Sequence, residues 1–539
     1  MDLPADPIPA LAADQATPQN KSSQRAHTFL FLAAAAVAAL CIDFGAFHRL
    51  HNSDSIVPVM MSLWRWTPYY WEQDRFGMLV PLLTIPFKSP LANLLAQSAI
   101  NAFCGLATFF LCARYVVRRA WLVTGAVSAC IFLLFATERA RFLYLGLQQP
   151  YGVGMFLGLG GLLLLENSES SRLLPVSFSF ICLLAASWVD GAVIFVLLPL
   201  ILFRWLFERD ARENARGTEN VIVSPGGRRS SLQKLVQLAK SFVERGSGLA
   251  VLLVLSSFAV TFVYSGMVSR SVAYGEWPYA PVRPWNWPAV WFQFGKYFWL
   301  DYLKQLWGIA LAALLAVGVI VRLPQRGKIR GLNPSAASLL ASSVVSFLLI
   351  GSLSHIQDMT FDPRFGLQSM VLLQVGAAAW AVLPIQALLG VNGRRALVAA
   401  SMCLFLGAPL CLYGWPSLAK VRGDLDSTLG QYTPEILQSG ATQIVGDYWN
   451  VWPATFHANM TLYEMGSNRK IWGVTVRSGP TEKFWSQIPA DKMRLAAIAG
   501  DPAVPYTLNM FSFPPVTEVG GFKTIVVYKA AQESDEPQR

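Results

Sequence analysis

The 539-residue sequence predicts an α-helical polytopic membrane protein that carries a small C-terminal α/β domain. Of its residues 54% are hydrophobic and only 14% are charged, whereas about 25% are charged in soluble globular proteins. Apolar runs of the length of a membrane helix, about 20 residues, recur between residues 28 and 414. These observations exclude an ordinary soluble enzyme.

The apolar runs predict eleven membrane spans. Residues 1–27 are polar and rich in Pro, Ala, Gln and Ser, so we expect a disordered cytoplasmic tail there. The membrane domain then covers residues 28–414. Its predicted spans are 28–47, 91–113, 120–137, 150–166, 173–189, 191–207, 249–267, 305–322, 337–353, 367–389 and 396–414. An odd number of spans places the two termini on opposite sides of the membrane.

The distribution of Lys and Arg predicts the orientation. The long loop at 208–246 is strongly basic, the turn at 189–191 has no Lys or Arg, and the loop at 354–366 has only Arg364. Basic loops stay in the cytoplasm, so the N-terminus is expected inside and the C-terminus outside. The net charge of +11 is thereby assigned to cytoplasmic loops, and no nucleic-acid partner is predicted.

Three predicted outer segments are too long to be turns: 48–90, 268–304 and 415–539. The first contains two stretches, 55–66 and 69–80, with the pattern of interfacial amphipathic helices. The second contains Trp285, Trp287 and Trp291, which we expect to anchor the chain at the membrane surface. The third alternates strand-like runs (443–448, 470–476, 495–499, 523–529) with helix-like runs (453–464, 482–488), which predicts an α/β domain with a partly parallel sheet.

The first outer segment contains the most promising ionisable residues. Asp54 follows the first span closely, and Glu72, Asp74 and Arg75 come about twenty residues later. Charged groups near a bilayer are costly and therefore point to function. The alternative for Asp54 is that it caps a helix beginning at Ser55.

This arrangement resembles the GT-C superfamily of membrane glycosyltransferases, in which one span is followed at once by a large outer loop with an acid near its start. The segment from His355 to Gly366, HIQDMTFDPRFG, is similar to the "R-[YF]" segment of many members. The C-terminal segment with Gly446-Asp447-Tyr448-Trp449 resembles the terminal domain of several bacterial members. The chain departs from the arabinose- and mannose-transferring members, because Ser55 rather than Glu follows Asp54.

The resemblance implies transfer of a sugar from a polyprenyl-phosphate donor to a glycan, lipid or protein acceptor on the outer face. Such a reaction needs a carboxylate that deprotonates the acceptor hydroxyl and cations that stabilise the leaving phosphate. Asp54 is the predicted general base, with Glu72 and Asp74 as second acids, and one direct displacement predicts inversion. For the phosphate we expect Arg364, then Arg75 and Arg139. Arg364 has the alternative of snorkelling to the headgroups, and Arg75 that of pairing with Glu72 or Asp74.

Further sugar or acceptor contacts are predicted at five residues: His355, Asp358, Asp362, Asp447 and Trp449. The alternative for Trp449 is that it packs the C-terminal domain onto the membrane helices together with Trp452. The spacing of His355, Asp358 and Asp362 matches no tight metal site, so no ligand set is assigned and a divalent cation remains open. No other cofactor is predicted.

Three other functions compete with sugar transfer: a transporter or flippase of lipid-linked saccharides, a polymerase or ligase, and a membrane scaffold. A transporter typically has internal repeats and intramembrane charges. This sequence shows no repeat, and its charges gather outside the predicted spans. A polymerase typically has its large outer loops late in the chain, and a scaffold leaves the loop from Asp54 to Arg75 unexplained.

Overall fold

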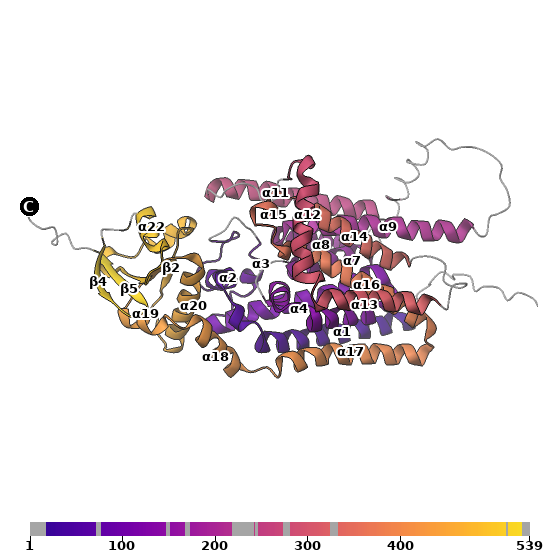
Figure 1. Cartoon of the computed structure of the whole chain (residues 1–539), viewed down its shortest axis with the longest axis horizontal. Coiled ribbons are helices and arrows are strands. Elements are labelled where there is room, and N and C mark those ends of the chain that lie inside the picture. The colour runs from indigo at the N-terminus through magenta and orange to yellow at the C-terminus, as the bar shows by residue number, and fades with distance from the viewer. Residues whose placement is uncertain are drawn as a thin grey trace, which may run out of the picture.

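A long helical bundle with a mixed β-sheet at one end makes up this computed structural model (Figure 1). The structure describes residues 18–71, 77–146, 151–167, 173–217, 242, 246–272, 281–323, 333–511, 513 and 516–530. The long helices of the bundle run roughly side by side, and the sheet lies beyond their ends in Figure 1.

Most of the bundle consists of long apolar helices. Seven of them are long and apolar enough to cross a membrane within the described ranges, or eight if one bent pair forms a single span. The long helices are α1 (Pro18–Gly45), α4 (Pro90–Val117), α9 (Ile194–Gly217), α11 (Ser247–Val272), α14 (Pro334–Gly351), α16 (Leu367–Leu388) and α17 (Val391–Tyr413). The chain is therefore a polytopic helical membrane protein.

Three predicted spans correspond to helices shorter than the usual length of a span. They are α5 (Trp121–Phe135), α7 (Tyr151–Glu166) and α8 (Leu173–Val189), all apolar. Each predicted run thus lies on an apolar helix, but seven or eight of them, not eleven, have the length expected of a span. A total of eleven spans remains a prediction.

The bent pair places one helix across the bundle. Helix α12 (Trp287–Phe298) continues through the π-helical turn η6 (Trp299–Leu303) and then breaks by 85° into α13 (Leu306–Arg322). In Figure 1, α12 stands roughly at right angles to the long helices. Its inner face carries Val290, Phe294 and Phe298, which are buried against the bundle.

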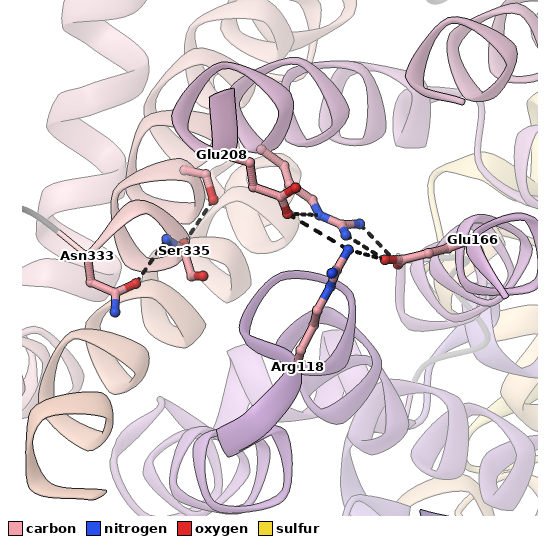
Figure 2. A network of polar contacts seen from close by, with 7 residues as sticks. Arg118, Glu166, Glu208, Asn333 and Ser335 are labelled. Carbon is pink, nitrogen blue, oxygen red and sulfur yellow. Dashed lines mark hydrogen bonds and ion pairs between the residues drawn. The ribbon is translucent and has the colours of Figure 1, made fainter. Parts of the chain in front are cut away.

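An ionic network ties together several helix ends on the predicted cytoplasmic side. The Arg204 side chain on α9 is only 10% exposed and donates to both carboxylate oxygens of Glu166 on α7 and to Glu208 one turn along α9. Arg118, directly after α4, also pairs with Glu166 (Figure 2). The same view shows the Asn333 side chain, which accepts from the Ser335 backbone and caps α14.

The C-terminal region (residues 418–530) contains a five-stranded sheet. Its strands are β1 (Gln443–Val445), β2 (Trp472–Val474), β3 (Arg494–Ile498), β4 (Val516–Gly521) and β5 (Ile525–Ala530), in the order β2-β1-β3-β5-β4. The first three strands are parallel, with Ile444 opposite both Gly473 and Ala496. The pairs β3–β5 and β4–β5 are antiparallel. The accompanying helices are α18 (Leu418–Leu429), α19 (Thr433–Ser439), α20 (Tyr448–Glu464), α21 (Glu482–Trp485) and α22 (Ala503–Met510).

An apolar cluster joins this region to the bundle. Helix α2 (Ser53–Trp64) packs its Ile56 and Met60 with Trp452 and Phe456 of α20, and the cluster also takes in Leu94 of α4. Buried aromatic side chains of this size contribute much of the stability of such a contact. The C-terminal region is therefore packed against the segment that follows α1.

The two amphipathic helices predicted in that segment require correction. The stretch 55–66 does form a helix, but α2 is buried from Ser53 to Ser62 and does not lie on a membrane surface. The described residues of the stretch 69–80 are not helical at 69–71 and 77–78, and the short helix α3 begins only at Leu79 (Leu79–Leu83). Docking of α20 covers the face of α2 that the sequence pattern predicts to contact the membrane.

Candidate functional site

Asp54 lies in the first turn of α2 and does not cap it. The cap is Asn52, whose side chain accepts from the Asp54 backbone, while the Ser55 hydroxyl accepts from the Asn52 backbone to complete a capping box. The prediction that Asp54 caps a helix from Ser55 is therefore wrong, because the helix begins two residues earlier. A carboxylate in the first turn is stabilised by the positive end of the helix dipole.

The Asp54 side chain is buried between the helical bundle and the C-terminal region. It is 6% exposed, and its Oδ1 accepts a 2.7 Å hydrogen bond from the hydroxyl of Tyr448, the first residue of α20. The Tyr448 hydroxyl lies 3.0 Å from the Tyr70 hydroxyl, which also lies 3.2 Å from the Ser53 carbonyl oxygen. A neutral donor bonded to a carboxylate makes a charge-assisted bond, stronger than one between two neutral groups.

Three further predicted site residues follow Asp54 by about twenty positions. Glu72, Asp74 and Arg75 lie outside the described residues. Tyr70 and Trp71, immediately before them, are buried in the same apolar cluster as α2.

Two histidines, His48 and His51, lie just after the C-terminal end of α1, close to Asp54 in sequence. Their rings are 5.3 Å apart, and His51 Nδ1 lies 3.1 Å from the Ser55 hydroxyl. Burial lowers the pKa of His48 below its ordinary value, and that of His51 well below it. Burial thus disfavours the charged form of both rings.

A second polar cluster brings together residues from three parts of the chain. Arg139 on α6 (Glu138–Arg141) contacts Asp362 at 3.0 Å and Asp301 of η6 at 3.7 Å. Arg364 lies in the turn η8 (Pro363–Gly366), and its Nε is 3.5 Å from Asp362 Oδ2. The structure thus gathers Arg139, Asp362 and Arg364, which the sequence analysis assigns separately.

The two arginines of this cluster differ in exposure. The Arg139 side chain is 60% exposed, whereas that of Arg364 is 17% exposed and lies 4.9 Å from the centre of the Phe365 ring. A snorkelling arginine extends into the headgroup region. Arg364 instead folds back onto its own turn, which disfavours the snorkelling alternative.

Ring contacts lie between the two clusters. His51 packs edge-on against Phe142, with the centroids 5.9 Å apart. Phe142 follows α6, which carries Arg139. Through this ring contact, the surroundings of Asp54 adjoin the segment of the chain that carries Arg139.

Asp447 and Trp449 follow strand β1, and both have structural partners. Asp447 caps α20 by accepting from the Trp449 backbone, and its own backbone N–H donates to Asp501 at 2.7 Å. Trp452 is fully buried against the bundle, but Trp449 is 47% exposed. Packing onto the membrane helices therefore describes Trp452 and not Trp449, whose ring remains accessible beside Tyr448.

The remaining predicted contacts do not form a metal site. His355 packs against Phe365, and Asp358 is exposed at the end of α15 (Ser354–Asp358). In the part of the chain that the structure describes, no group of three or more His, Cys, Asp or Glu side chains is arranged to hold a metal ion.

Of the three tryptophans expected at the membrane surface, one is exposed and two donate hydrogen bonds within the protein. Trp285 is exposed. Trp287 donates to the Val282 carbonyl, and Trp291 donates to the Leu348 carbonyl and the Ser352 hydroxyl of the α14 end. The last two thus also hold α12 against the protein.

Several potential functional residues are missing from the sequence analysis. Tyr70 and Tyr448 carry no sequence signal, because what marks them is their contact with Asp54. Asp43 lies within the first span, and both its carboxylate oxygens are buried without a hydrogen-bond partner in the described ranges. An ionisable residue within an apolar run is a functional candidate, so the sequence could have indicated Asp43.

No family model matches the sequence, and no curated protein matches it.

Proposed function

We propose that this chain is an integral membrane glycosyltransferase that moves a sugar from a polyprenyl-phosphate donor to a glycan, lipid or protein acceptor. The observation that carries the proposal is the buried Asp54 carboxylate, hydrogen-bonded to Tyr448 where an apolar helical bundle meets the C-terminal region. The resemblance to the GT-C superfamily supports the same reaction. We place the site on the extracytoplasmic face, as the loop charges predict, and in a bacterial inner membrane, as the resemblance of the terminal segment to bacterial members implies.

Asp54 acts as the general base in this proposal. It accepts the proton of the acceptor hydroxyl while the acceptor oxygen bonds to the anomeric carbon and the bond from that carbon to the phosphate oxygen breaks. The electron pair of that bond leaves with the polyprenyl phosphate. A single displacement of this kind inverts the anomeric configuration.

Arg364 and Arg139 are the proposed cations for the leaving phosphate. A planar guanidinium binds phosphate oxygens through two parallel hydrogen bonds. Both arginines contact Asp362, and Arg139 also contacts Asp301. The donor is a phosphodiester with one negative charge, whereas the leaving polyprenyl phosphate carries up to two, so the two arginines stabilise the leaving group more than the donor.

A transporter or flippase of lipid-linked saccharides is the second candidate, because of Asp43. A buried carboxylate within a span is a functional hypothesis by default, and proton-coupled transporters use such groups. The two candidates therefore depend on different carboxylates: transfer on Asp54 and transport on Asp43.

The test compares the envelope glycans of a host lacking this gene after complementation with wild type, Asp54→Asn or Asp43→Asn. All three proteins are brought to equal amounts in the membrane. Transfer predicts that wild type and Asp43→Asn restore the missing sugar and that Asp54→Asn does not. The reverse result, with Asp54→Asn active and Asp43→Asn inactive, would reject transfer in favour of transport.

A further inference from the structure

The candidate base is held by a residue from the opposite end of the chain. The Tyr448 hydroxyl donates to Asp54 Oδ1 at 2.7 Å, and the Ser53 hydroxyl donates to the Tyr448 backbone carbonyl at 2.5 Å. The Tyr70 hydroxyl lies 3.0 Å from that of Tyr448. The four residues are buried, so water does not replace these bonds freely.

The sheet fixes where Tyr448 lies. Strand β1 ends at Val445, and Gly446 turns the chain with φ of 154°, in a conformation that side chains rarely adopt. Asp501, which follows the neighbouring strand β3, accepts from the Asp447 backbone, and Asp447 caps α20. The first residue of α20 is therefore held by two parallel strands and a helix cap.

The ring of Tyr448 has two further neighbours. The Arg477 guanidinium, in the loop after β2, lies 4.7 Å from the ring centre. The Trp449 ring packs edge-on at 5.0 Å. Segments after all three parallel strands thus contribute to the surroundings of Tyr448, at the edge of a sheet where α/β folds usually bind their ligands.

We propose that Tyr448 is a positioning residue for Asp54 and that the candidate active centre is shared between the membrane bundle and the C-terminal region. This inference rests on the proposed function. A carboxylate rotates readily about its terminal bond unless a partner fixes it. The bond to Oδ1 fixes its plane, and Tyr70 orients the Tyr448 hydroxyl. Tyr448 keeps its proton throughout, while Asp54 alone takes the proton of the acceptor.

The test measures transfer by the purified full-length protein in lipid vesicles. The donor is undecaprenyl phosphate linked to the sugar that envelope analysis finds missing, and the acceptor is supplied as membranes from the host lacking the gene. Tyr448→Phe removes only the hydroxyl. Tyr463→Phe is the matched control, because Tyr463 is exposed on the same helix.

Tyr448→Phe is expected to lower kcat by about 10- to 100-fold, the usual worth of a hydrogen bond to a charged group, with the KM for the donor nearly unchanged. Tyr463→Phe should keep wild-type kinetics. Replacing Tyr448 with 4-aminophenylalanine, which keeps a donor at the same place, should restore most of kcat. Misfolding alone would instead reduce the amount of active protein and would not be corrected by the restored donor.

Two outcomes would overturn the inference. Wild-type kcat in Tyr448→Phe, with Asp54→Asn inactive, would reject positioning by Tyr448 and leave the proposed function standing. Full activity in both variants would reject the proposed function itself. If Tyr448→Phe does not accumulate, Tyr70→Phe replaces it, with an expected loss of about threefold or more, since it removes the group that orients Tyr448. Wild-type kcat in that variant would contradict the proposal.

Discussion

Tyr448 donates its hydroxyl hydrogen bond to Asp54 across 394 positions of the chain. Asp54 lies in the first turn of the buried helix α2, which follows α1, and Tyr448 begins α20 after the first strand of the sheet. The contact is accompanied by an apolar cluster that contains Ile56, Trp452 and Phe456. The candidate base and the C-terminal region therefore form one packed unit, and the predictions below test its parts separately.

The role of Asp54 can be separated from that of the helix cap. Asn52→Ala removes the cap of α2 and should cost about 1 kcal/mol of stability while most of the transfer activity remains. Asp54→Asn keeps the size of the side chain and should lower activity by about 100- to 10,000-fold. Thermal unfolding and envelope sugar content measure the two effects. An equal loss of activity in both variants would mean that the start of α2, and not its carboxylate, is what matters.

The ionic network around Arg204 should contribute to stability and not to transfer. The Arg204 side chain is only 10% exposed and pairs with Glu166 and Glu208. Glu166→Gln removes the first of these charges and leaves Glu208. Breaking a fully buried pair costs about 3–5 kcal/mol, and because Glu166 is 28% exposed we expect about 2 kcal/mol. Arg118→Ala, at a side chain 56% exposed, should cost less than about 1 kcal/mol. Melting temperatures in detergent check this order, and a reversed order would refute it.

Stability should fall as the pH falls below about 6.5, the ordinary pKa of histidine. Burial lowers the pKa of His457, although Asp426 opposes this shift. Between the lowered pKa of the folded state and the ordinary pKa of the unfolded state, the unfolded chain binds more protons than the folded one. The stability is therefore present above about pH 6.5 and is lost on acidification. His48 and His51 shift in the same direction. His457→Gln should reduce the fall in melting temperature between pH 7.5 and 5.5, and an unchanged fall would contradict the assignment.

The orientation of the chain can be tested without knowing the substrate. Alkaline phosphatase folds only outside the bacterial cytoplasm, where its disulfides form. Fused after residue 539 it should be active, and fused within the basic loop 208–246 it should be inactive. The opposite pattern would place Asp54 and the C-terminal region on the cytoplasmic side and would exclude a polyprenyl-phosphate reaction on the outer face.

Local composition was enough to predict the helical membrane architecture. It could not predict that α2 is buried, because the residues that cover it, such as Trp452 and Phe456, come about 400 positions later. Strand β4 was not predicted, because its own sequence lacks the pattern of a strand. It contains Gly520 and Gly521 and a register shift between Glu518 and Gly520, which together interrupt the alternation expected of a strand.

In the candidate site too, the sequence indicates single residues, and the fold determines which of them lie together. Arg139, Asp362 and Arg364 were each recognisable as charged residues near span ends, but only the folded chain brings them into one cluster with Asp301. Asp447 looked like a ligand contact because it follows a strand, and the structure gives its carboxylate to the cap of α20. Tyr448, its neighbour, makes the contact with Asp54 instead.

The most direct test of the central claim is transfer by purified wild type and Asp54→Asn from an undecaprenyl-phosphate-linked sugar, with the anomeric configuration of the product determined by NMR. Wild type should form an inverted product, and Asp54→Asn should be slower by about 100- to 10,000-fold at equal amounts of folded protein. Equal rates in the two proteins, or a product with retained configuration, would contradict the account of Asp54 as the general base of a single displacement.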